Sequence, residues 1–208
     1  NRLLGQNVLK GLILGTYRKP VNERRFVMFL DIAGSTSIAE KLGDIEFHAF
    51  LNDFFCDIAQ PIINHHGEIY KYVGDEVIIT WKERIGAKNH NALNLVGDVD
   101  KAIESRREHF RRRYGVVPEY RAGLHFGPLV VGEMGFDKQE IAFSGDVMNT
   151  ASRIQSECKA LGERFLVSDA ALERLCPRGD RSFSCTIVSR GAAKLRGKSV
   201  EIGISAVR

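Results

Sequence analysis

The spacing of apolar residues changes several times along this chain, and each change marks the edge of a predicted element. Residues 26–30 are continuously apolar but too few for a helix, so they predict a buried strand. From residue 37 to residue 65 the apolar positions recur at helical spacing. Gly43 and Asp44 interrupt this run, which predicts a short helix followed by a long one.

Two strand-like runs, 68–73 and 76–81, come next, and only Gly74 and Asp75 separate them. Such a pair between strands is a two-residue hairpin signal. The remaining pattern predicts a helix over 88–114, two strands within 119–134 around Gly127 and Pro128, a strand over 139–143, a helix over 147–161, a strand over 165–167, a helix over 169–175, and closing strands over 182–190 and 198–206. This order predicts an α+β fold, with helices packed on a mostly antiparallel sheet.

The first twenty residues carry apolar side chains at helical spacing, and the run ends before Pro20. It is shorter than a membrane span and polar residues interrupt it. No signal-peptide cleavage site follows it. We therefore predict an amphipathic connector helix over 1–20 and a globular domain over 21–208. The connector could pair with its copy in a dimer or pack on its own domain, and the pattern favours neither.

Composition and charge narrow the class of protein. The chain has 208 residues, of which 44% are hydrophobic and 27% charged, which suits one well-filled domain or two small ones. A net charge of +4 with a pI near 8.9 suits a polyanionic small molecule but is too weak to indicate nucleic-acid binding. The four cysteines lack metal-ligand spacing and indicate reduced thiols in a cytoplasmic setting. Since the chain begins at Asn1 without a methionine, we expect it to be part of a longer protein.

Asp31 follows the first predicted strand directly, and a small polar turn that contains glycine comes next. Ser37 and Glu40 have the spacing of a capping box at a helix start. A simple cap would explain a carboxylate there. A carboxylate beside an anion-binding helix start favours a metal ion that is shared with a phosphate.

Asp75 places a second carboxylate at the predicted hairpin tip. By itself, an aspartate in such a tip is most often a turn residue. Together with Asp31, it favours a site for Mg²⁺ or Mn²⁺, because carboxylates without a neighbouring His or Cys are hard oxygen ligands.

Asn149 and Arg153 lie one turn apart on one face of the predicted helix over 147–161. An amide and a guanidinium would suit a ribose and a phosphate. An isolated pair of this kind is more often a solvent-exposed polar face. The basic end of the helix over 88–114 is likewise interpreted as a solvated face near a helix C-terminus.

Taken together, three segments resemble the catalytic domain of class III adenylyl and guanylyl cyclases. They are FLDIAGST at 29–36, KYVGD at 71–75 and GDVMNTASR at 145–153. GLHFGP at 123–128 and RGAAKLRGK at 190–198 support the resemblance, which covers roughly residues 24–207. It implies the ferredoxin-like, palm-type sandwich of that family, preceded by the connector helix.

The resemblance also implies a reaction, in which ATP becomes 3′,5′-cyclic AMP and pyrophosphate by attack of the ribose 3′-hydroxyl on the α-phosphate. Asp31 and Asp75, with the carbonyl of Ile32, would hold two divalent ions per active site, Mg²⁺ or Mn²⁺. Asn149 would orient the ribose, and Arg153 would stabilise charge at the α-phosphate in the transition state.

Base selection in that family uses two positions. Lys71 occupies the first, where a lysine donates to adenine N1. Ala142 occupies the second and offers no side-chain acceptor for the adenine amino group, so Ser144 or a backbone carbonyl would substitute, or base selection would be weak. The resemblance assigns phosphate contacts to the backbone amides of the polar turn, at Gly34, Ser35 and Thr36. Weaker candidates for such contacts are three basic side chains, those of Lys138, Arg196 and Lys198.

Catalytic domains of that family pair head to tail, with the metals on one protomer and the base, Asn and Arg contacts on the other. The resemblance therefore implies a homodimer that acts on ATP, without a nucleic-acid partner, fused to an upstream regulatory or membrane region. The chain would be cytoplasmic or the cytosolic domain of a membrane-anchored protein.

Three alternatives compete with the interpretation as an adenylyl cyclase. The first is a guanylyl or dual-specificity cyclase, and the second is a catalytically silent regulatory domain. The silent form is disfavoured because Asp31, Asp75, Asn149 and Arg153 are all present. The third, a diguanylate cyclase, is set aside because residues 73–77 lack the doubled glycine of its signature.

Overall fold

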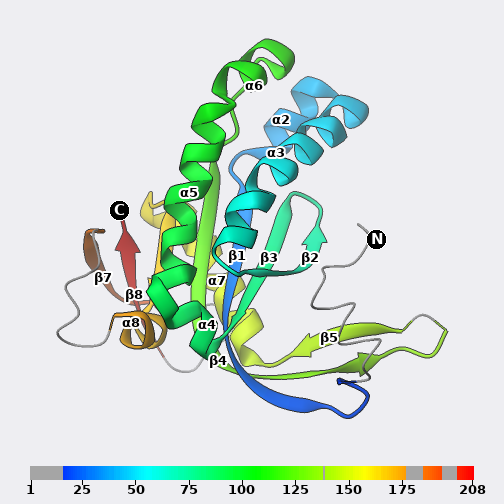
Figure 1. Cartoon of the computed structure of the whole chain (residues 1–208). Helices are drawn as coiled ribbons and strands as arrows, with labels where there is room; N and C mark the ends of the chain where they lie inside the picture. The colour runs from blue at the N-terminus through cyan, green and yellow to red at the C-terminus, as the bar shows by residue number, and fades with distance from the viewer. Residues whose placement is uncertain (1–15, 138, 177–184, 194–200) are drawn as a thin grey trace.

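Eight strands form one sheet in the order β2-β3-β1-β4-β6-β8-β7, and β5 pairs with β4 off this path (Figure 1). The structure is a computed structural model that describes residues 16–137, 139–176, 185–193 and 201–208. The strands are β1 (Val21–Ile32), β2 (Glu68–Val73), β3 (Glu76–Lys82), β4 (Tyr120–Met134), β5 (Glu140–Ser144), β6 (Phe165–Ser168), β7 (Ile187–Ala193) and β8 (Ile202–Val207). The helices are α2 (Ser35–Leu42), α3 (Asp44–Asn64), α4 (Glu83–Ala87), the 3₁₀ helix η1 (Lys88–His90), α5 (Asn91–Ser105), α6 (Arg107–Tyr114), α7 (Asp146–Leu161) and α8 (Asp169–Leu175).

β1 lies between β3 and β4, and its residues 25–30 are all buried. Successive side chains of a strand point to opposite faces, so a run that is buried throughout requires cover on both faces. The even-numbered apolar side chains of β1 pack with α3 and α5, and the odd-numbered ones pack against α7. Figure 1 shows α3 and α5 along one face of the sheet. The continuous apolar run in the sequence follows from this double cover.

The predicted α+β architecture, a mostly antiparallel sheet with helices packed on it, is confirmed. Every strand pairing in the described sheet is antiparallel except that of β4 with β6. The helix break at Gly43 and the hairpin at Gly74 and Asp75 are also found. The predicted closing strands correspond to β7 and β8, each displaced toward the C-terminus.

The prediction of two strands around Gly127 and Pro128 is wrong, because β4 runs unbroken from Tyr120 to Met134. Pro128 lies opposite Arg24 of β1, and its missing N–H would break a ladder bond in a central strand. On its other side, however, β4 pairs with β6 only at 122–124 and with β5 only at 130–134. Pro128 falls between these two stretches, at an edge-like position that tolerates proline.

The prediction of one helix over 88–114 is also wrong, since α5 and α6 are separate helices that follow η1. Asn89 and His90 have left-handed backbone angles, with φ of 52° and 54°, which interrupt the helix before α5. Arg106 interrupts it again, with φ of −106° and ψ of 3°. Acidic side chains of α3, α5 and α6 neutralise the basic segment around α6: Arg106 pairs with Asp57, Arg107 with Glu104, Arg111 and Arg112 with Glu108, and Arg113 with Asp53.

Most of the predicted connector helix over 1–20 lies outside the described residues, and residues 16–20 form turns and bends. Among the helices that the structure describes, none is long and apolar enough to cross a lipid bilayer.

Candidate active site

Two carboxylates that are far apart in the sequence meet at one end of β1. The antiparallel pairing of β1 with β3 puts Asp31 opposite Glu76, so the hairpin turn brings Asp75 beside Asp31. The amide of Ile32 donates a hydrogen bond to the carbonyl oxygen of Asp75 at 3.4 Å. The two carboxyl groups lie close enough that Asp75 raises the pKa of Asp31. The structure thus joins the two residues that the sequence predicted as metal ligands.

The protonation of these groups reflects how closely the negative charges are crowded. Burial first, then the hydrogen bond and charge of Asp75, raise the pKa of Asp31 from 3.8 to about 7. Burial and the charges of Asp31 and Asp75 raise the pKa of Glu76 to about 7 as well. Near neutral pH, positive charge brought to such a cluster favours the ionisation of its carboxylates. A divalent cation supplies such charge.

The donor set also fits an ion that shares its coordination with substrate. No group of three or more His, Cys, Asp or Glu side chains within the described residues is arranged to hold a metal ion. Mg²⁺ is commonly held by one or two carboxylates, with phosphates and water completing its shell. Ile32 has an aliphatic side chain without a ligating atom, so only its backbone carbonyl could act as a ligand.

Two further residues reach Asp31 that the sequence analysis missed. Gln155 of α7 donates from Nε2 to the Asp31 carboxylate at 3.3 Å. Arg121 lies opposite Asp31 in the β1–β4 register, and its charge lowers the pKa of Asp31, against the effect of burial. Gln155 had a sequence signal, because it continues the buried apolar positions Val147 and Ala151 at helical spacing. A polar residue in an apolar stripe indicates a buried partner.

The turn after β1 opens directly into α2. α2 begins at Ser35 with Gly34 as its N-cap residue, in the left-handed conformation at φ 72°. The predicted capping box of Ser37 with Glu40 is wrong, because the helix starts two residues earlier and no side chain caps it. The first helical bond runs from the amide of Ile38 to the carbonyl of Gly34 at 3.2 Å. The preceding amides therefore have no intrahelical acceptor and face the end of β1, where an anion would be bound.

Asn149 and Arg153 do not join the carboxylates within one chain. Both lie on α7, where Asn149 is exposed and Arg153 partly exposed. Residues two apart on a helix point about 200° away from each other. Since Gln155 points to Asp31, Arg153 points to the opposite side of α7.

The base-selecting candidates lie together at a second place, where β2 approaches β5. The ring of Tyr70 stacks on that of Phe143, with centroids 4.3 Å apart and an interplanar angle of 6°. Lys71 Nζ lies 3.5 Å from a carboxylate oxygen of Glu140. Ala142 is partly buried and Ser144 exposed. The remaining phosphate candidates, Lys138, Arg196 and Lys198, lie outside the described residues.

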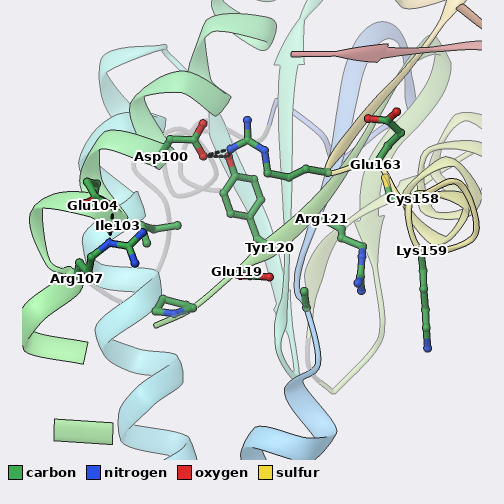
Figure 2. Close-up of a pocket in the computed structure, with 14 residues that line it drawn as sticks. Asp100, Ile103, Glu104, Arg107, Glu119, Tyr120, Arg121, Cys158, Lys159 and Glu163 are labelled. Atoms are coloured by element: carbon green, nitrogen blue, oxygen red, sulfur yellow. Dashed lines mark hydrogen bonds and ion pairs between the residues drawn. The ribbon is translucent and has the colours of Figure 1, made fainter. Parts of the chain in front are cut away.

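A cavity of about 500 Å³ adjoins the carboxylate end of β1. Ala33 and Arg121 belong to its wall, so it borders the Asp31 site without including the aspartates. Figure 2 shows Asp100 and Tyr120 on another part of the wall, where the Tyr120 hydroxyl donates to Asp100 at 2.7 Å. Arg164 pairs with the same carboxylate. The charged groups on this part of the wall are thus engaged with one another.

Solved structures of similar fold are nucleotide cyclases. The chain superposes on a bacterial light-regulated adenylyl cyclase with a TM-score of 0.84 at 21% identity, covering 100% of this chain and 59% of that one. The adenylyl cyclase CyaB from P. aeruginosa gives a TM-score of 0.77 at 22% identity, with 91% of this chain and 96% of that chain covered. The guanylyl cyclase Cya2 gives 0.75 at 21% identity, with 90% and 92% covered. These likenesses show the fold, which is the palm-type sandwich that the sequence predicted.

Sequence comparison identifies the family. Adenylate cyclase 2 of Rhizobium meliloti (strain 1021) is 39% identical over 175 residues, which are 84% of this chain and 48% of that protein. Guanylate cyclase D of Mus musculus is 31% identical over 209 residues, which are 97% of this chain and 18% of that protein. The chain thus spans about half or less of the length of these relatives. The family model described as Adenylate and Guanylate cyclase catalytic domain matches residues 19–204. The chain therefore belongs to the family of adenylate and guanylate cyclase catalytic domains.

Proposed function

We propose that this domain is an adenylyl cyclase, which converts ATP to 3′,5′-cyclic AMP and pyrophosphate. The observation that carries the proposal is the meeting of Asp31 and Asp75 beside the N-terminus of α2. This arrangement combines ligands for divalent cations with amides for a polyphosphate. Lys71 supports adenine as the base, and so does the 39% identical relative, which is named an adenylate cyclase.

Asp31 and Asp75, with the carbonyl of Ile32, would hold two Mg²⁺ or Mn²⁺ ions, which supply neutralising charge to the triphosphate and lower the pKa of the ribose 3′-hydroxyl. Gln155 keeps the Asp31 carboxylate in place through its hydrogen bond. The backbone amides of Gly34, Ser35 and Thr36 bind phosphate oxygens at the start of α2.

In the reaction, the 3′-hydroxyl gives up its proton to solvent water, the bond from the 3′-oxygen to the α-phosphorus forms, and the bond from that phosphorus to the pyrophosphate oxygen breaks. Asn149 orients the ribose, and Arg153 stabilises the charge that develops at the α-phosphate. Both face away from Asp31 within one chain, so a second copy of the chain supplies them. The catalytic unit is accordingly a head-to-tail homodimer with two shared sites.

The proposal extends to the whole protein. Residues 21–208 are the catalytic domain, and residues 1–20 connect it to an upstream regulatory or membrane region. The domain works on the cytoplasmic side and does not bind nucleic acid.

A turnover assay tests the proposal. The purified chain is incubated with ATP or GTP and Mn²⁺ or Mg²⁺, and the cyclic nucleotides are separated by chromatography. We expect cyclic AMP as the main product, no product after chelation of the metal, and none from the matched Asp31→Asn variant. Preferred formation of cyclic GMP would identify a guanylyl cyclase instead, and nucleotide binding without product would identify a silent regulatory domain.

A further inference from the structure

Glu140 lies beside the base-selecting lysine although 69 residues separate them. Lys71 Nζ and a carboxylate oxygen of Glu140 are 3.5 Å apart, and the two side chains are 48% and 54% exposed. Both charged groups are therefore open to a ligand. An exposed pair of this kind contributes little to folding.

β2 and β5 are not hydrogen-bonded neighbours in the described sheet, yet they are held in fixed register. The rings of Tyr70 and Phe143 stack, and the Phe143 amide donates to the Tyr70 hydroxyl at 3.2 Å. The guanidinium of Arg25, which is 1% exposed, lies 5.0 Å from the centre of the Phe143 ring. Glu68 and Thr80 anchor that guanidinium at 2.5 and 3.0 Å.

The register of β2 against β3 shifts between Ile69 and Lys71, so Tyr70 lies at an irregularity of the strand. Lys71 pairs with Ile78, which belongs to the same apolar cluster as Tyr70 and Phe143. The stack of Tyr70 on Phe143 therefore holds β2 against β5 directly beside the contact of Lys71 with Glu140. On β5, Glu140 and Phe143 are three apart and point to opposite sides of the strand. By the same alternation, Glu140 and Ala142 share one face of β5.

The edge of adenine presents an acceptor at N1 and a donor at its 6-amino group, whereas guanine presents a donor at N1 and an acceptor at O6. Lys71 supplies a donor, and the Glu140 carboxylate beside it is an acceptor. The methyl group of Ala142, on the same face of β5, supplies neither. We propose that Glu140 is a specificity-determining residue whose carboxylate accepts a hydrogen bond from the 6-amino group of adenine while Lys71 donates to N1. This inference rests on the proposed function, because it names the base-reading group of that site.

The test removes the one ligand group that Glu140 is inferred to contact. Purine riboside triphosphate keeps N1 but lacks the 6-amino group of ATP. For the parent protein we expect kcat/KM to be about 10- to 100-fold higher for ATP than for this analogue. In Glu140→Ala the ratio should fall close to one, because ATP then lacks the same hydrogen bond that the analogue cannot form. Glu140→Gln keeps an acceptor oxygen and should retain part of the ratio.

Asp137→Ala is the matched control, since it removes an exposed carboxylate from the same hairpin. It should leave the ratio unchanged, and all variants should keep the parental melting temperature. An equal loss for ATP and its analogue in Glu140→Ala would overturn the inference, because Glu140 would then only support the site. The same ratio is measured from dissociation constants of the 3′-deoxy nucleotides, which cannot cyclise. A chain that binds them without turning over ATP would defeat the proposed function but still test Glu140.

Discussion

At the scale of single residues, the half-buried carboxylate of Asp31 opposes folding when it is ionised. Its pKa is about 7 in the folded protein and 3.8 ordinarily, chiefly because of burial and then Asp75. The folded state therefore holds this proton more tightly than the unfolded chain does. It follows that folding stability falls as the pH rises from about 4 to about 7, and that the full loss persists above this window.

Replacing Asp31 with Asn removes this loss. At pH 8 without divalent metal, we expect the free energy of unfolding to rise by about 1–2 kcal/mol, after allowance for solvent screening of a half-buried group. At pH 4 the parent and the variant should unfold alike. Thermal unfolding at both pH values measures the effect, with Asp137→Asn as an exposed control. A gain of equal size at both pH values would contradict the assignment to Asp31 ionisation.

The same substitution should abolish activity and metal binding together. We expect turnover of ATP to fall at least 10³-fold in Asp31→Asn and in Asp75→Asn, about 4 kcal/mol of barrier. Mn²⁺ should raise the melting temperature of the parent and leave that of both variants nearly unchanged, because ligand binding to the folded state stabilises it. Comparable turnover in either variant would show that the metals are held elsewhere.

The proposed base choice also depends on single side chains. With Ala142 in place of an acceptor, we expect ATP to be preferred over GTP by about 10- to 100-fold in kcat/KM. Lys71→Glu should remove most of this preference, and Ala142→Asp should increase it. Specificity constants for both nucleotides are compared in the parent and the two variants. If the ATP preference survived in Lys71→Glu, the backbone near Ser144 would be the base reader.

At the scale of elements, the contact between β4 and α7 fixes the site. A Cβ at Gly123 would lie 2.2 Å from the backbone nitrogen of Gln155, closer than any relaxed contact allows. Only glycine lets β4 and α7 approach in this way, and α7 carries Gln155 toward Asp31. The spacing of strand and helix therefore sets the position of the Gln155 side chain against the Asp31 carboxylate.

Gly123→Ala should push α7 away from the sheet. We expect a loss of about 1–3 kcal/mol in unfolding free energy, typical of overpacking, together with at least tenfold lower turnover. Gly97→Ala is the matched control, since Gly97 lies exposed in α5 with no atom within 4 Å of the added methyl group. Helix propensity should make that variant slightly more stable and leave it fully active. If Gly123→Ala and the parent had the same free energy of unfolding, α7 would be able to move away from β4 without loss of stability.

At the scale of the whole molecule, the proposed homodimer follows from the two sides of α7, because Gln155 points to Asp31 and Arg153 points the opposite way. Asp31→Ala and Arg153→Ala should each be inactive alone. When mixed, half of the dimers would be heterodimers with one intact site, so activity should recover to about a quarter of the parental value. The recovery is measured after unfolding and refolding the mixture, with two portions of the same variant as the control. Heterodimers that form but stay inactive would place the complete site within one chain.

The sequence by itself determined the local features of this protein. The apolar run of 26–30, the hairpin at Gly74 and Asp75, and the helical spacing after residue 146 fixed β1, the β2–β3 turn and α7, because each depends on neighbouring residues only. The order of motifs also indicated the family. The connector over 1–20 and the roles of the site residues remain predictions.

Tertiary structure alone decided which residues meet. The partners Gln155 and Arg121 of Asp31, the pairing of Lys71 with Glu140, and the unbroken course of β4 past Pro128 depend on elements that come together across the fold. Periodicity tells which face of an element a side chain occupies. It does not tell which other element covers that face, because that choice is made by packing between segments distant in the chain.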